Sequence, residues 1–496
     1  MSSRPPGHAP KPRQAADFAR TAKLAGAVAG AVAVIAGAVV LALPVFADRE
    51  ASTGNPFERA RPPDVVLIVT DDQRFDTMSR MPIVQEKLGK HGITFANAFV
   101  TNPICCPSRA TILTGQYSHS TGVYANAGRY GGFPNFYEAS TLATWLDEDF
   151  DTGLFGKYLN GYKTAGGKGF IPLGWDKWIS TIANGIYYNY DMNFDGTVRH
   201  FGRDPEDYST RVLADQAVSF IKGTKDPVFV YFTPPVPHGP ADPEYQDRNE
   251  FATIPRWFPP SYNEEDISDK PQWLKDYPQL HGPSENYIQE FRVNQLRTLQ
   301  SMDRGVGRIV DALAETGRLD NTLIIFTSDN GYMWGEHRLM GKGVAYEEAI
   351  RVPLIVRYDP LIEGPRTDDH IVVNVDLAPT IAELAGVPAP EAEGDSLVRL
   401  FENSKAPWRK DFLLEHWSPG RNSDPPTFCG VRGQRYKYVD YSYGTDELYD
   451  LQRDPDELEN LINDPAMRQI RDQMRRRTLE LCHPKPPKTP RPVPTG

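Results

Sequence analysis

The feature that most constrains the fold is a set of uninterrupted runs of β-branched and aromatic residues. The runs are Val65–Thr70, Val228–Thr233, Leu323–Thr327 and Leu354–Val356. A strand with one face in water alternates polar and apolar residues, so a continuous run predicts a strand buried on both faces. Helical patterns separate the runs, and the clearest has apolar residues spaced by three and four between Ile288 and Leu313. This alternation indicates an α/β fold with a large, mostly parallel sheet sandwiched by helices.

After about residue 405 the pattern changes to short segments. Phe412–Glu415, Tyr436–Tyr441 and Glu447–Leu451 predict short strands, and Pro465–Leu481 predicts a helix, which together indicate a small α+β subdomain with an antiparallel sheet. Residues 255–285 form a long Pro- and aromatic-rich insertion, and loops of that length are usually functional. The predicted organisation is a signal peptide at 1–47, a polar lead-in at 48–63, a catalytic domain at 64–404, the C-terminal subdomain at 405–482 and a disordered Pro-rich tail at 483–496.

The N-terminus has the pattern of a secretory signal. Five basic side chains precede an uncharged run at 24–43, and small residues stand before a cleavage position after Ala47. The alternative is a retained membrane anchor, because the run is just long enough to span a bilayer. Cleavage predicts a secreted protein without stable membrane contact. It would also take the formal net charge from −11 to −15, because residues 1–47 carry five basic groups and one acidic group. Such an acidic chain argues against a general nucleic-acid binder.

The four cysteines divide into two kinds. Export permits disulfides, and Cys429 and Cys482 in the C-terminal part are the natural pair. Cys105 and Cys106 are adjacent and could bridge only through a strained ring, so their presence in an exported protein needs another explanation.

Polar residues follow three of the predicted strands. Asp71 and Asp72 follow the first, His238 follows the second, and Asp329 and Asn330 follow the third. In open parallel sheets ligands bind at the carboxyl ends of strands, so these residues could converge. The acidic residues and Asn330 offer oxygen ligands only, which favours one Ca²⁺ ion over softer metals. The alternative is that these motifs are ordinary turns and helix caps.

The segment from Pro103 to Gly115 carries the most specific signal. Its Cys-Cys-Pro-Ser-Arg core predicts a strand-to-helix turn with Arg109 on the first helical turn. Helix N-terminal amides and an arginine would bind an anion and lower the pKa of the Cys105 thiol. The alternative is a buried structural pair of cysteines.

This segment resembles the sulfatase signature, Cys-x-Pro-Ser-Arg followed by Thr and Gly, at every defining position. The resemblance implies an alkaline-phosphatase-like fold and conversion of Cys105 to formylglycine by a formylglycine-generating enzyme before export. Formylglycine is an aldehyde that hydrates to a diol, the nucleophile of the family. Cys106 occupies a variable position and is expected to be a bystander.

Other segments of the chain also resemble sulfatase motifs, and they occur in the order in which the family has them. The Ca²⁺ ligands of the family are matched by Asp71, Asp72, Asp329 and Asn330. In the family the Ca²⁺ ion also binds the diol, which here would be made from Cys105. Lys157, His238 and Lys342 match its sulfate-binding and leaving-group residues, and Glu447–Leu461 resembles its C-terminal signature. Arg109 is expected to stabilise the diol.

The lysine motif departs from many sulfatases, because Leu159 stands where they have a histidine that assists sulfate release. Asn160, His119 and His337 are candidates for that base. Gly-Lys-Tyr-Leu-Asn, Gly115–His119 and the insertion at 255–274 resemble the N-acetylglucosamine-6-sulfatase and heparan 6-O-endosulfatase branch. The prediction is therefore a sulfuric ester hydrolase that releases sulfate from a sulfated small molecule or glycan.

Two other functions stay open at the level of sequence. The first is a phosphonate monoester or phosphodiester hydrolase that uses the same modified cysteine. The second is a non-catalytic, Ca²⁺-dependent glycan-binding protein in which Cys105 is never oxidised. A phosphatase of the alkaline-phosphatase type is disfavoured, because no serine or threonine replaces Cys105.

Overall fold

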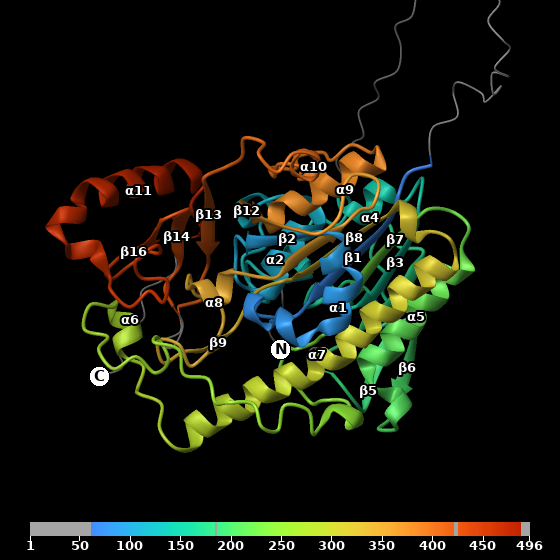
Figure 1. The fold of residues 1–496 in the computed structure, drawn as a ribbon, viewed down its shortest axis with the longest axis horizontal. Coiled ribbons are helices and arrows are strands. Elements are labelled where there is room, and N and C mark those ends of the chain that lie inside the picture. The colour runs from blue at the N-terminus through green and yellow to red at the C-terminus, as the bar shows by residue number, and fades with distance from the viewer. Residues whose placement is uncertain (1–60, 184–185, 421–424, 488–496) are drawn as a thin grey trace, which may run out of the picture. The chain divides into compact units, whose positions relative to one another are not determined.

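The predicted buried runs form the centre of a ten-stranded sheet within the described part of the chain (Figure 1). The computed structural model describes residues 61–183, 186–420 and 425–487, so the predicted signal peptide, most of the lead-in and the end of the tail lie outside it. In spatial order the strands are β12 (Arg366–Val373), β2 (Ile93–Phe99), β11 (Leu354–Arg357), β8 (Thr322–Ser328), β1 (Asp64–Thr70), β7 (Val228–Thr233), β3 (Asp151–Gly156), β4 (Lys177–Thr181), β5 (Tyr190–Phe194) and β6 (Thr197–Phe201).

The middle of this sheet is parallel and its flanks are mixed. Strands β8, β1, β7, β3 and β4 run in one direction. The expectation for the run at 354–356 needs a correction, because β11 is antiparallel to both of its neighbours, β8 and β2. The apolar run at 354–356 indicates burial on two faces but carries no information about strand direction.

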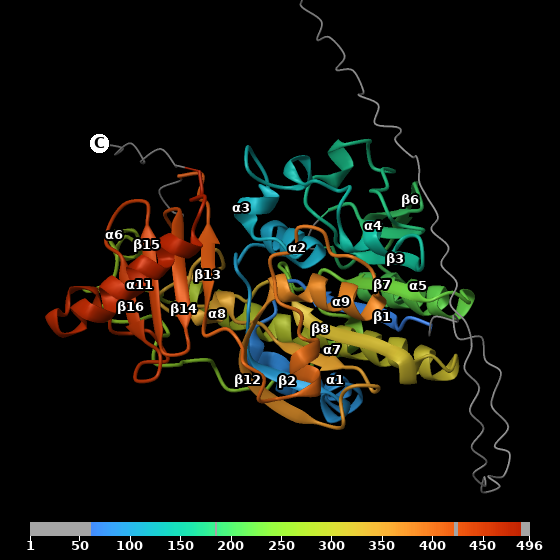
Figure 2. The same ribbon diagram turned by 90° about the horizontal axis from the view of Figure 1, so that it is seen from above.

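Helices cover both faces, as the uninterrupted apolar runs require. Val65, Leu67 and Val69 pack with α2 (Cys105–Thr114), α4 (Leu142–Leu146) and α9 (Leu377–Ala385). Val66 and Ile68 point the other way, towards α1 (Pro82–Lys87), α5 (Ser209–Gly223) and α7 (Pro283–Glu315). Figure 2 shows α2 and α4 on one side of the sheet and α1 and α7 on the other.

The C-terminal part forms a second, antiparallel sheet. Its order is β13 (Asp411–His416), β14 (Phe428–Gly433), β15 (Tyr436–Tyr441) and β16 (Glu447–Asp450), and α11 (Arg468–Leu481) packs against it. Three of these strands and the helix match the predicted segments, whereas β14 was not predicted. A disulfide joins Cys429 to Cys482. The shorter elements are α3 (Ser118–Thr121), α6 (Gln272–Lys275), β9 (Met333–Trp334), β10 (Met340–Gly341), α8 (Glu347–Ile350) and α10 (Val398–Glu402).

None of the helices in the described ranges is both long enough and apolar enough to cross a membrane.

Candidate active site

The parallel strands bring the predicted site residues to one edge of the sheet. Thr70 at the end of β1 is in register with Ser328 at the end of β8, and Gly156 at the end of β3 is in register with Thr233 at the end of β7. Asp71, Lys157 and Asp329 are therefore the first residues beyond β1, β3 and β8, which are parallel strands in the middle of the sheet. The predicted convergence at the carboxyl ends is confirmed.

The acidic residues form a buried oxygen cluster. Ligand atoms of Asp71, Asp72, Asp329 and Cys105 all lie within 4.8 Å of one another. Asp72 donates its backbone N–H to Asp329 Oδ1 at 3.2 Å, and Asn330 Nδ2 donates to Asp72 Oδ1 at 2.7 Å. Asn330 Oδ1 is buried and has no hydrogen-bond partner among the described residues. Three carboxylates and an unpaired amide oxygen are the donor set that Ca²⁺ prefers, so these residues fit the ion that the family implies.

Cys105 begins helix α2 at the centre of this cluster. Its Sγ lies 3.3 Å from Asp71 Oδ1 and 2.7 Å from Lys342 Nζ. Because the helix begins at Cys105 itself, Arg109 lies on the second helical turn and not on the first. The expected fall in the thiol pKa is also wrong. Burial, with the charges of Asp329 and Asp71, raises the pKa of Cys105.

Four cationic or polar groups face the carboxylates. Arg109 Nε donates to Asp329 Oδ2 at 2.7 Å, Lys157 Nζ donates to Asp71 Oδ2 at 2.7 Å, and Lys342 Nζ pairs with Asp72. His238 Nε2 lies 3.9 Å from Asp72 Oδ2. Burial alone would raise the pKa of Asp71, but the charges of Lys157, His238 and Arg109 hold that pKa well below its usual range. Every predicted site residue thus belongs to one cluster.

Gly156 explains how the lysine motif is placed. Its φ is +134°, and a Cβ there would lie 2.1 Å from the carbonyl oxygen of Thr233. This close approach lets Lys157 donate its backbone N–H to that oxygen at 2.8 Å, while Thr233 Oγ1 donates to the Lys157 carbonyl at 2.7 Å. The glycine therefore fixes the direction in which Lys157 leaves the strand.

Gly156→Ala is expected to push β3 away from β7 and displace Lys157. The strained backbone and the overlap predict a loss of about 1–3 kcal/mol or more in the free energy of unfolding, measured by chemical denaturation. Gly223→Ala is the matched control, because nothing lies within 4 Å of a Cβ at that helical position. Equal stability of the two variants would contradict this account of Gly156.

A buried network from the C-terminal sheet holds the segment that carries Lys342. Lys437 Nζ donates to the Ala345 carbonyl at 2.6 Å and pairs with Glu457. Glu457 Oε2 accepts the backbone N–H of Glu347 at 2.9 Å, and Glu447 accepts the Tyr346 hydroxyl at 2.7 Å. The sequence places Glu447 and Glu457 in the segment that resembles the C-terminal signature, but it does not reveal that they contact the segment that carries Lys342.

The structure separates the three candidates for the missing base. His119 Nδ1 lies 3.1 Å from Glu415, and despite partial burial Glu393 and Glu415 raise its pKa to about 10. His337 Nδ1 lies 2.6 Å from Glu264, and burial lowers its pKa to about 3. The acidic partners of these two histidines in the described part of the chain are Glu393, Glu415 and Glu264, and none of the three belongs to the carboxylate cluster.

Asn160, the third candidate, lies beside a predicted site residue. It lines a cavity of about 290 Å³ together with Lys157 and Leu159. Its backbone N–H donates to Cys106 Sγ at 2.9 Å, so the second thiol faces this loop and not the carboxylates.

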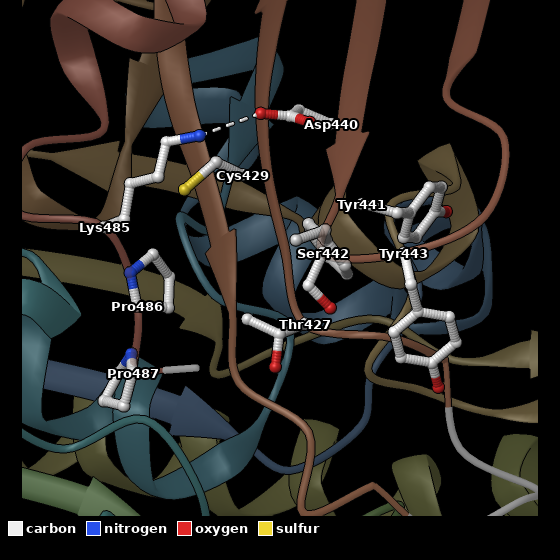
Figure 3. Close-up of a pocket in the computed structure, with 10 residues that line it drawn as sticks. Thr427, Cys429, Asp440, Tyr441, Ser442, Tyr443, Lys485, Pro486 and Pro487 are labelled. Carbon is white, nitrogen blue, oxygen red and sulfur yellow. Dashed lines mark hydrogen bonds and ion pairs between the residues drawn. The ribbon is translucent and has the colours of Figure 1, made fainter. Parts of the chain in front are cut away.

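A larger cavity of about 730 Å³ lies in the C-terminal part (Figure 3). Residues of β14, of β15 and of the chain after Cys482 line it, and Lys485 Nζ pairs with Asp440 at 3.1 Å across it. None of the predicted site residues is among them, so the candidate active site is the smaller, charged cluster at the sheet edge.

Comparisons with known proteins point to one family. The family model described as "Sulfatase" matches residues 63–387, and the model described as "N-sulphoglucosamine sulphohydrolase, C-terminal" matches residues 335–483. Human N-acetylglucosamine-6-sulfatase is 37% identical over 390 residues, which cover 74% of this chain and 69% of that protein. The extracellular sulfatase SULF-1 homolog of Drosophila melanogaster is 35% identical over 73% of this chain, but the chain spans only 34% of its length.

Solved structures show the same fold. A structure in complex with its substrate D-glucosamine-2-N,6-O-disulfate has a TM-score of 0.74 and 25% identity, and covers 85% of this chain and 97% of its own. The phosphonate monoester hydrolase of Agrobacterium radiobacter has a TM-score of 0.69 at 21% identity, over 87% of this chain and 100% of its own, and shows the fold alone. The signature cysteine lies among the predicted carboxylates and cations, and a family model matches most of the chain, so the chain belongs to the sulfatase family.

Proposed function

We propose that the protein releases inorganic sulfate from a sulfated sugar of the N-acetylglucosamine-6-sulfate type. The observation that carries this proposal is the position of Cys105, whose Sγ lies between Asp71 and Lys342 in a cluster buried at the sheet edge. The identity to N-acetylglucosamine-6-sulfatases supports the substrate class.

Two groups complete the site in this proposal. Asp71, Asp72, Asp329 and Asn330 would hold Ca²⁺ together with the modified residue 105, and the ion would supply positive charge for the sulfate oxygens. Formylglycine made from Cys105 would supply a nucleophilic hydroxyl and a second hydroxyl that allows sulfate to be expelled.

The remaining residues bind the anion and move a proton. Arg109 and Lys157 balance the charges of Asp329 and Asp71, which keeps the site from repelling a sulfate ester. Lys342 lies against Cys105 Sγ and binds a sulfate oxygen there. His238 is more exposed than its neighbours and is placed to protonate the leaving sugar oxygen.

The proposal extends to compartment and maturation. We propose that residues 1–47 direct secretion and that the catalytic domain at 64–404 and the subdomain at 405–482 act as one enzyme. The names of the fly and worm extracellular sulfatases support this compartment. A formylglycine-generating enzyme would act on Cys105 before the chain folds, because Cys105 is fully buried in the folded protein.

The test is a comparison of substrates with the purified, secreted protein. Sulfate release is measured from N-acetylglucosamine-6-sulfate, from glycosaminoglycan fragments and from an aryl sulfate, alongside hydrolysis of an aryl phosphonate. The proposal expects the highest kcat/KM on a 6-sulfated glucosamine. A higher kcat/KM on the phosphonate would instead identify a phosphonate monoester hydrolase of this fold.

A further inference from the structure

A row of aromatic rings runs from the protein surface towards the carboxylate cluster. Tyr287 on the first turns of α7 is 57% exposed. Its ring stacks on Phe291 with centroids 6.1 Å apart, and Phe291 in turn lies 5.4 Å from the ring of Tyr332. The three rings form one continuous row, which we call the aromatic wall.

The inner end of the wall is fixed to the active site. Tyr332 comes two residues after Asn330, and its backbone is held by Arg74, which donates to its carbonyl at 3.1 Å. Phe291 lies 3.4 Å from the position that a Cβ of Gly239 would take, directly beside His238. The inner end of the aromatic wall therefore lies beside His238, the residue predicted to act on the leaving group.

The outer end is carried by a rigid element. Tyr287, Phe291 and Gln295 are spaced by four on α7, so they share one helix face. Gln295 Nε2 donates to the Pro237 carbonyl at 3.0 Å, which ties this face to the loop that carries His238. The exposed ring of Tyr287 is thus held in a defined direction relative to the site.

The chemistry of the wall matches a sugar ring. A pyranose has polar edges and a C–H face, and that face packs on the electron-rich face of an aromatic ring. A half-exposed tyrosine between a charged site and the solvent offers such a face. Its side chain has few rotatable bonds, so little conformational entropy is lost when a sugar binds. The anion site would bind the sulfate, and the wall would bind the part of the substrate that extends beyond it.

We propose that the aromatic wall binds a sugar ring adjacent to the sulfated sugar, so that the enzyme prefers sulfated oligosaccharides over sulfated monosaccharides. This inference rests on the proposed function and adds a saccharide subsite to it. Tyr287 is a substrate-binding residue in this account, and Tyr332 and Phe291 position it against the site.

The test compares Tyr287→Ala with wild type on two substrates. One is N-acetylglucosamine-6-sulfate, and the other is a tetrasaccharide that carries the same 6-sulfated residue. Loss of one stacking ring is expected to lower kcat/KM for the tetrasaccharide about tenfold, mainly through KM. The monosaccharide should keep its kcat/KM, because it does not reach Tyr287.

Controls make the result specific. Tyr287→Phe keeps the ring and should behave as wild type, and Tyr137→Ala removes a tyrosine that is 71% exposed elsewhere and should also change nothing. The inference would be overturned if Tyr287→Ala affected both substrates equally or had no effect on either. In that case, activity of the wild-type enzyme on the two substrates would still support the proposed function. Absence of wild-type activity on every sulfated sugar would defeat the proposed function itself, and the subsite with it.

Discussion

Cys105→Ser is expected to abolish repeated turnover of a sulfate ester while leaving the fold intact. Serine has nearly the size of the buried thiol, so the packing around α2 should persist. Its single hydroxyl could accept the sulfuryl group, but it lacks the second hydroxyl from which the family's diol expels sulfate. Loss of a catalytic nucleophile predicts a fall in kcat of about 10³-fold or more.

Two measurements check this result together. Steady-state sulfate release gives the loss of turnover, and intact mass after incubation with substrate should show a trapped ester of about 80 Da. Cys106→Ser is the matched control, since Cys106 faces the Asn160 loop and should retain most activity. Sustained turnover by Cys105→Ser would contradict the proposed chemistry.

Lys437→Met is expected to destabilise the protein strongly and to lower activity without touching the catalytic cluster. Lys437 is 0% exposed and is the cation between Glu457 and Glu347, which lies 3.5 Å from its Nζ. Removing it leaves Glu457 buried without its cation, although Glu347 keeps Arg432 at 3.0 Å, and loss of one partner of a buried ion pair typically costs about 3–5 kcal/mol. It also releases the Ala345 carbonyl, so the Lys342 segment should lose its fixed position.

The free energy of unfolding and kcat are the quantities to measure for this variant. Lys222→Met provides the control, because it breaks an exposed pair with Glu315 whose removal should cost less than about 1 kcal/mol. A Lys437→Met protein as stable as this control would show that the network contributes nothing to holding the Lys342 segment.

The sequence allowed prediction of those parts of the fold that depend on local pattern. Val65–Thr70 and Val228–Thr233 are confirmed as strands buried on both faces, since every residue in them is buried. The site could be located because Asp71 and Asp329 each follow such a strand, and parallel strands share their carboxyl edge, whereas the strand before Lys157 was not predicted.

Features that depend on distant contacts could not be predicted. The direction of β11 is set by its pairing with β2 and β8, and its own four residues do not encode it. The pKa of Cys105 depends on how deeply α2 is buried, which outweighs the helix N-terminus that the sequence reveals. The roles of Lys437 and Glu457 arise only from contacts with residues about 90 to 110 positions away.

The most direct test of the central claim is the mass of the peptide that contains Cys105, taken from protein that actively releases sulfate from a 6-sulfated glucosamine. Conversion of the cysteine to formylglycine should lower that mass by about 18 Da, and the converted fraction should rise in proportion to specific activity. Fully active protein with an unmodified thiol at position 105 would contradict the account.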